Sequence, residues 1–133
     1  MKKIMLVLGL SVGSVALAEG AKEEKFELKG DAVKGETAYK TNCISCHGEK
    51  GQGDGIAAGQ LNPKPTNFAD KANAERLTDE WVYKMIKDGG AKHGKSEMMV
   101  SWTETLSDED VRNVAAYVLK FKPAAKGGKK SKK

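Results

Sequence analysis

The sequence predicts an all-α domain with three to four short helices, joined by loops that are rich in glycine and proline. Three observations lead to this prediction. Apolar residues recur at helical spacing in two segments, 81–86 and 111–118, and each segment follows a residue that can cap a helix. The segment 48–68 contains five glycines and two prolines, which favour turns over regular structure. No segment shows a clear strand pattern.

The first 18 residues have the features of an export signal. Lys2 and Lys3 precede an apolar run over 4–15, and the small-x-small tripeptide Ala16-Leu17-Ala18 follows this run. We therefore expect residues 1–18 to be a signal peptide that is cleaved after Ala18. The alternative is an uncleaved N-terminal anchor, although the apolar run is short for a membrane span.

The first helix is expected over 31–42, after a lead-in over 19–30 that is charged, has little apolar content and predicts a flexible segment. Val33 and Tyr39 mark the inner side of this helix, with Ala38 as a further candidate. Gly35 lies in its middle, where glycine costs about 1 kcal/mol relative to alanine. A glycine at this position suggests that another helix or a bound group approaches closely.

The pentapeptide Cys43-Ile44-Ser45-Cys46-His47 contains both cysteines of the chain. C-x-x-C-H is the attachment site of a c-type haem, in which the two thiols form thioether bonds with the vinyl groups and the histidine binds the iron. The alternatives are a dithiol redox pair, one small disulfide, or half of a zinc site. A zinc site would lack a ligand, because the only other histidine is His93.

The middle of the chain predicts a long loop, a second helix and another loop. Residues 48–68 would wrap one side of the haem. The second helix is expected over 79–87, with Thr78 as its N-cap and two glycines after it. Its apolar stripe consists of Trp81, Val82, Met85 and Ile86. We interpret Met85 as a packing residue, with a role as iron ligand as the alternative, and residues 91–105 as a loop.

The last helix has the clearest signals. Ser107 is a candidate N-cap, and Asp110 stands where the acid of a capping box is expected. Val111, Val114, Ala115 and Val118 form its apolar face. The tail over 122–133 has six lysines and no acid, so we expect it to be disordered. Residues 19–121 carry 15 basic and 18 acidic residues, a net charge of −3, which argues against nucleic-acid binding by the domain.

A haem iron that is bound by one histidine has a second axial position. Met98 and Met99 stand in the polar loop before the last helix, without helical periodicity. A thioether ligand suits Fe(II) and raises the redox potential. Either methionine is therefore a candidate ligand, with His93 as the alternative. An open position would instead indicate gas binding or peroxide chemistry.

Residues 31–121 resemble a class I c-type cytochrome, a small monohaem electron carrier of the bacterial periplasm. The resemblance rests on several segments in the family's order, namely Gly35-Glu36-Thr37-Ala38-Tyr39, Cys43 to Gly48, Gly53-Asp54-Gly55, Leu61-Asn62-Pro63-Lys64-Pro65, Met99-Val100-Ser101-Trp102, Leu106-Ser107-Asp108-Glu109 and Val114-Ala115-Ala116-Tyr117-Val118. It implies the cytochrome c fold around one covalent haem c. It also implies low-spin His/Met ligation and a role in electron transfer without enzymatic activity.

The resemblance favours Met99 as the axial ligand, because the family's methionine stands three residues before an aromatic and seven before a leucine, here Trp102 and Leu106. Many members have proline after this methionine, whereas this chain has Val100. Met98 stays as the alternative. The tryptophan is a candidate donor to a haem propionate, or else a core residue.

Two further contacts follow from the resemblance. The first and last helices would cross, with Gly35 and Tyr39 packing on Val114 and Tyr117. A backbone carbonyl of the proline segment would accept a hydrogen bond from the ring N–H of His47, which fixes its orientation. Pro63 is the first candidate for this carbonyl, and Pro65 is the second.

The expected function is that of a monomeric periplasmic electron carrier that docks transiently with redox partner proteins. Exposed lysines near the loops, Lys50, Lys64, Lys92 and Lys95, are candidates for the docking face. The lysine-rich tail could make weak contact with an anionic membrane surface or an acidic partner. One alternative is a cytochrome subunit of a larger respiratory or sulfur-oxidising oxidoreductase. Another is a haem-based gas sensor or peroxidase with a displaceable methionine.

Overall fold

A computed structural model describes residues 25–124. Its α-helices are α1 (Ala32–Asn42), α2 (Ile44–His47), α3 (Asp79–Asp88) and α4 (Asp108–Leu119). Short 3-10 helices lie in the connecting segments: η1 (Ala58–Gln60), η2 (Lys71–Asn73) and η3 (Ala91–His93). Residues 25–124 contain no strand, so the predicted all-α class is confirmed. The expected signal peptide and residues 125–133 of the tail lie outside the described residues.

Each of the three predicted helices begins after a capping residue, and for α3 and α4 these are the predicted caps, Thr78 and Ser107. Asp31 accepts a hydrogen bond from the backbone N–H of Val33 at 2.8 Å. Thr78 caps α3 by accepting from Trp81 N–H at 3.1 Å. The capping box of α4 is complete, because Ser107 and its N3 acid accept from each other's backbone N–H groups. Local hydrogen bonds therefore determine where each helix starts.

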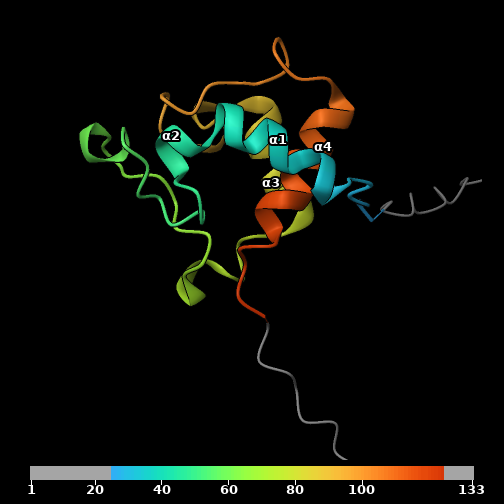
Figure 1. Ribbon diagram of the computed structural model, residues 1–133, viewed down its shortest axis with the longest axis horizontal. Coiled ribbons are helices and arrows are strands. Elements are labelled where there is room, and N and C mark those ends of the chain that lie inside the picture. Colours follow the sequence, from blue (N-terminus) through green and yellow to red (C-terminus); the bar gives the residue numbers. More distant parts are fainter. Residues whose placement is uncertain (1–24, 125–133) are drawn as a thin grey trace, which may run out of the picture.

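Helix α1 crosses α4 at Gly35, as the mid-helix glycine suggested (Figure 1). A Cβ atom at Gly35 would overlap the backbone carbonyl of Asn113 and lie 2.8 Å from the backbone nitrogen of Val114. Tyr39, one turn further along α1, is fully buried, and its ring centroid lies 5.2 Å from that of Tyr117. Only glycine therefore allows this approach of the two backbones.

The prediction that Val33 faces inward is wrong. Its side chain is 76% exposed. Residues four apart share a helix face, so Gly35 and Tyr39 point together toward α4. A residue two positions before Gly35 is turned by about 200° around the helix and points to solvent.

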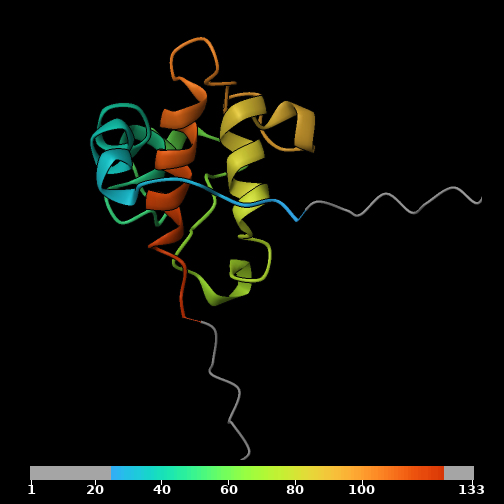
Figure 2. The same cartoon turned by 90° about the vertical axis from the view of Figure 1, so that its right-hand side faces the viewer.

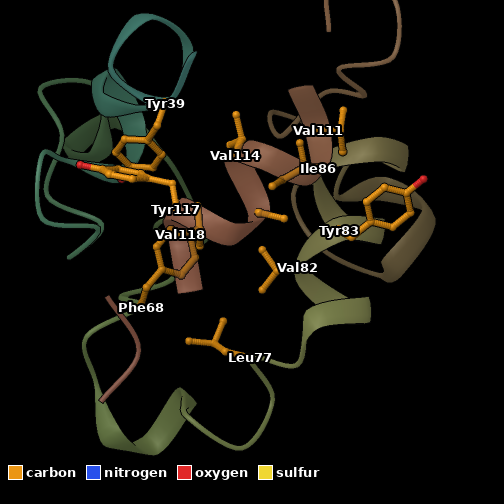
Figure 3. Packing of buried hydrophobic residues seen from close by; sticks show 11 residues of the cluster. Tyr39, Phe68, Leu77, Val82, Tyr83, Ile86, Val111, Val114, Tyr117 and Val118 are labelled. Atoms are coloured by element: carbon orange, nitrogen blue, oxygen red, sulfur yellow. The ribbon is translucent and has the colours of Figure 1, made fainter. Parts of the chain in front are cut away.

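The hydrophobic core lies between α3 and α4 and extends to α1 (Figures 2 and 3). Val82 and Ile86 of α3 belong to the same buried cluster as the valines of α4. The predicted apolar face of α4 is buried at all four positions. On α3 the prediction differs from the structure at two residues, because Trp81 is only partly buried and Tyr83, outside the predicted stripe, is buried.

Tyr83 is covered by residues 25–30, which we expected to be part of a flexible lead-in. These residues instead cross α4 and α3 (Figure 2). The ring centroids of Phe26 and Tyr83 lie 5.1 Å apart, and the guanidinium of Arg112 lies 4.7 Å from the Tyr83 ring centroid and 5.6 Å from that of Phe26. Arg112 also donates to the carbonyl of Glu27 at 3.3 Å. The packed domain therefore begins before residue 31.

We expect Phe26→Ala to lower the free energy of unfolding by about 1–3 kcal/mol, less than for a fully buried phenylalanine, because Phe26 is partly buried. Urea unfolding of the haem-containing protein, followed by circular dichroism, measures this effect. Lys25→Ala is the control, because Lys25 is exposed. Equal stability of the two variants would contradict the assignment of residues 25–30 to the packed domain.

Candidate haem-binding site

Both cysteines, His47 and both methionines of the 96–100 segment line one cavity. The cavity opens to solvent, and its empty volume is about 910 Å³ when the adjoining open solvent is included. Most of the remaining lining is apolar and comes from the Gly/Pro loop, α3 and α4: Leu61, Pro63, Pro65, Phe68, Trp81, Val82, Met85, Ile86, Val114 and Val118. The structure thus brings the predicted thiols, imidazole and thioethers to a single apolar site.

The pentapeptide is held by Tyr39 at both ends. The backbone N–H of Cys43 donates to the Tyr39 carbonyl at 2.8 Å. The pentapeptide then turns through α2, where His47 N–H donates to the Cys43 carbonyl at 2.8 Å. The buried hydroxyl of Tyr39 donates to the Gly48 carbonyl at 2.7 Å. These contacts fix the two thiols and the imidazole relative to the crossing of α1 and α4.

The Gly-rich loop binds the backbone of the pentapeptide. The last carbonyls of a helix have no partner inside the helix. Here Ser45, Cys46 and His47 accept from loop N–H groups at 2.8, 3.2 and 2.9 Å, the last two of which belong to glycines. A Cβ atom at Gly55 would overlap the carbonyl of Ser45, so a larger residue could not approach. The glycines therefore allow the loop to pack closely against α2.

His47 is suited to bind a metal ion. Burial lowers the pKa of its imidazole to about 4, so the ring is neutral at neutral pH, which is the form that coordinates metals. The ring stacks on Phe68 with centroids 5.0 Å apart. Its Nδ1 atom is buried and has no hydrogen-bond partner among the described residues. A haem fits this set, because an imidazole, two thiols and two thioethers share one apolar cavity.

The predicted hydrogen bond between His47 and a proline carbonyl is not formed in this structure. Pro63 and Pro65 both line the cavity, as expected. The carbonyl of Pro65 instead packs against the backbone of Gly53, where a Cβ atom would overlap it. The backbone of the proline segment is therefore directed by its contact with the Gly-rich loop.

The alternatives to haem attachment receive no support from the geometry. Burial raises the pKa of the Cys43 thiol to about 12, whereas a reactive dithiol needs a lowered pKa. Residues 25–124 contain no group of three or more His, Cys, Asp or Glu side chains that could hold a metal ion. These observations argue against a dithiol redox pair and against a zinc site.

The methionine segment is fixed to the end of α3. The Met99 carbonyl accepts from Gly90 N–H at 2.7 Å, and Trp102 N–H donates to the Ile86 carbonyl at 3.2 Å. Met99 is partly buried and packs against the hydrophobic cluster, whereas Met98 is 69% exposed. The backbone thus holds Met99 at the cavity wall, and Met98 lies nearer to solvent.

Two other predicted residues lie elsewhere. His93 is 3.3 Å from the carboxylate of Asp88 and is not part of the cavity lining. Trp102 is also outside the lining, and its indole Nε1 is buried without a hydrogen-bond partner among the described residues. In contrast, Phe68 and Met85 line the cavity. Nothing in the sequence singles out Phe68, and the helical stripe favours a packing role for Met85 over iron ligation.

Comparison with known proteins places this architecture in a family. The family model described as Cytochrome c matches residues 32–122. Cytochrome c-554(548) of Halomonas halodenitrificans is 32% identical over 88 residues, which cover 66% of this chain and 93% of the relative. The solved structure of the KustC0563 c-type cytochrome has a TM-score of 0.54 and 28% identity, and the match covers 67% of this chain and 98% of that chain.

Other relatives are longer proteins. The Cbb3-type cytochrome c oxidase subunit CcoP of Azospirillum brasilense is 30% identical over 95 residues. These cover 65% of this chain but only 27% of the relative, so this chain spans about a quarter of that protein. The match over nearly the whole described domain, and the cavity lined by both thiols of the C-x-x-C-H motif, lead to one conclusion. The chain belongs to the cytochrome c family, carries one covalently bound haem c and transfers electrons.

Proposed function

We propose that this chain is a periplasmic one-electron carrier, in which Cys43 and Cys46 hold the haem and His47 and Met99 bind its iron. The observation that carries the proposal is the shared apolar cavity of these four side chains, one of which comes from a segment about 50 residues away. When bound, the haem supplies an iron that cycles between Fe(II) and Fe(III). The chain's own residues would supply the ligands of the iron, determine the polarity of the cavity and limit the access of water to the haem.

The protein environment favours the reduced state. The thioether of Met99 is a neutral, soft ligand, and Met/His ligation raises the potential of a haem. The apolar wall, which includes Val82 and Ile86, lowers the local polarity and so disfavours the additional positive charge of Fe(III). Because His47 and Met99 would both bind the iron, no position on it would be left for a substrate. We therefore propose electron transfer without a catalytic reaction of the chain itself.

Two buried nitrogen atoms that have no hydrogen-bond partner within residues 25–124 support further contacts around the haem. The Nδ1 atom of His47 is a donor to a carbonyl of the Pro63 segment, with Pro65 as the alternative, once the haem fixes the ring. The indole Nε1 of Trp102 is a donor to a haem propionate. Each contact would satisfy a buried polar atom, which otherwise destabilises the protein.

The redox properties of the purified protein test this proposal. We expect a protein whose haem stays attached in denaturant and whose potentiometric titration follows a reversible one-electron curve. Cys43→Ala with Cys46→Ala should abolish the attachment, because both thioether bonds are lost. Carbon monoxide should bind slowly or not at all to the reduced native protein. Rapid binding would contradict a filled sixth position and would favour a gas sensor or peroxidase.

The proposed setting is the periplasm, with a monomeric chain that docks transiently with redox partners. Within residues 25–124, no helix is long and apolar enough to cross a membrane. Lys50 and Lys92 are exposed, as a docking face requires, and charge can steer such encounters. Any contact of the lysine-rich tail with a membrane surface or an acidic partner concerns residues outside the described range.

A second candidate is a cytochrome subunit of a larger oxidoreductase. The similarity to a cbb3-type oxidase subunit, over about a quarter of that relative, favours this function specifically. Affinity purification of the tagged chain from gently solubilised cells distinguishes the two functions. A stoichiometric catalytic subunit in the eluate supports the complex, and a free monomeric cytochrome supports the carrier.

A further inference from the structure

The haem cavity has only two residues that are formally charged at neutral pH. They are Lys64 and Lys95, and both are exposed, so their ammonium groups can stay hydrated at the cavity mouth. Within residues 25–124, neither side chain takes part in an ion pair or a hydrogen bond. The ion pairs of the described residues use other lysines, namely Lys29, Lys34, Lys40, Lys84 and Lys87. The cavity lining thus has two cations without a counter-ion.

The two lysines come from different loops, and the backbone of each is held in place. Lys64 stands between Pro63 and Pro65, whose rings restrict the backbone on both sides. The carbonyl of Pro65 also packs against the Gly53 backbone. On the other loop, the backbone N–H of Lys95 donates to the Gly90 carbonyl at 2.9 Å. Both side chains therefore start from defined positions at the cavity.

Each lysine has a hydroxyl residue of the same loop beside it in the cavity lining. Thr66 lies two positions after Lys64, and Ser96 follows Lys95. The Oγ atom of Ser96 accepts from the backbone N–H of Met98 at 3.2 Å, so its own proton stays available for donation. Each loop thus offers one ammonium group and one hydroxyl donor, a set that suits a carboxylate.

We propose that Lys64 and Lys95, one from each loop, bind the two propionate groups of the haem, each with the help of its neighbouring hydroxyl. A haem c has two carboxylates, and a carboxylate at an apolar cavity is stable only when cations and donors compensate its charge. The inference rests on the proposed function, because it needs the haem in this cavity. It gives Lys64 and Lys95 a role in haem binding that Lys50 and Lys92 do not have, although the sequence made all four candidates for a docking face.

Charge-removing variants of the isolated haem protein test this assignment, with no partner present. Lys64→Gln and Lys95→Gln should each shift a propionate band in the redox-difference infrared spectrum. Each should also reduce the Fe(II)/Fe(III) ratio at a fixed solution potential by about two- to fivefold, as expected for a partly exposed charged pair. The ratio falls because the loss of a nearby positive charge stabilises Fe(III), which carries one more positive charge than Fe(II). Lys64→Arg and Lys95→Arg should retain the parent spectrum and ratio.

Lys50→Gln and Lys92→Gln are the matched controls, because both lysines are exposed and lie outside the cavity lining. Their propionate bands should not shift. If Lys64→Gln and Lys95→Gln behave like these controls, the assignment is wrong and the lysines belong to a docking surface. A reversible one-electron couple in all variants keeps the proposed function intact, whereas a chain without haem would overturn both.

Discussion

Met99→Ala is expected to lower the midpoint potential of the haem by on the order of 0.1–0.3 V, part of the roughly 0.8 V range that axial ligands span. The thioether favours Fe(II), and its removal leaves the sixth position to water or to a stronger donor. The oxidised protein should also lose the weak absorption band near the red end of the spectrum that marks a methionine–iron bond. Potentiometry and absorption spectroscopy measure both effects on the purified protein.

Met98→Ala is the matched control, because Met98 directly precedes Met99, lines the same cavity and is 69% exposed. It should leave the red band in place and change the potential little. The opposite result, with the band lost only in Met98→Ala, would assign the ligand to Met98. The partly buried position of Met99, and its backbone bond to Gly90 at 2.7 Å, are the reasons for our expectation.

Gly35→Ala should lower the free energy of unfolding by about 2–3 kcal/mol, although alanine favours helix formation. The added methyl group would overlap the backbone carbonyl of Asn113, and backbone atoms cannot turn away as a flexible side chain can. Helices α1 and α4 would have to separate, which loosens the packing of Tyr39 on Tyr117. We expect a loss of about 10–20 °C in the melting temperature, measured by circular dichroism on the haem-containing protein.

Gly59→Ala is the control for this substitution. Gly59 is exposed in η1, and a Cβ atom there would have no heavy atom of residues 25–124 within 4 Å apart from its chain neighbours. Its melting temperature should stay unchanged or rise slightly, because alanine restricts the unfolded chain. Similar losses in both variants would show that glycine is needed for local backbone freedom and that the helix crossing is not the reason.

The helix starts could be predicted from the sequence because they depend on neighbours in the chain. Ser107 and Asp110 form their capping box within four residues, and Thr78 caps α3 across three. The apolar stripe of α4 was predictable for the same reason, since helical periodicity is a local property. The C-x-x-C-H motif likewise contains its thiols and imidazole within five residues.

Contacts between distant segments could not be predicted in this way. Phe26 is one of few apolar residues in a charged segment, and its packing on Tyr83 depends on where residues 25–30 cross α3. Val33 points to solvent because α1 meets α4 through the face that carries Gly35 and Tyr39, and this choice of face depends on a helix far away in the sequence. Phe68, which stacks on His47, had no local signal either.

The sequence by itself determined the helical class, the helix starts and the two thiols and imidazole of the attachment motif, because these depend on residues close together in the chain. Only the tertiary structure decided which further residues meet them. It placed Met99 at the wall of the same cavity, His93 outside the lining beside Asp88, and Lys64 with Lys95 at the cavity lining. Loop paths determine these placements, and they follow from packing between segments far apart in the sequence.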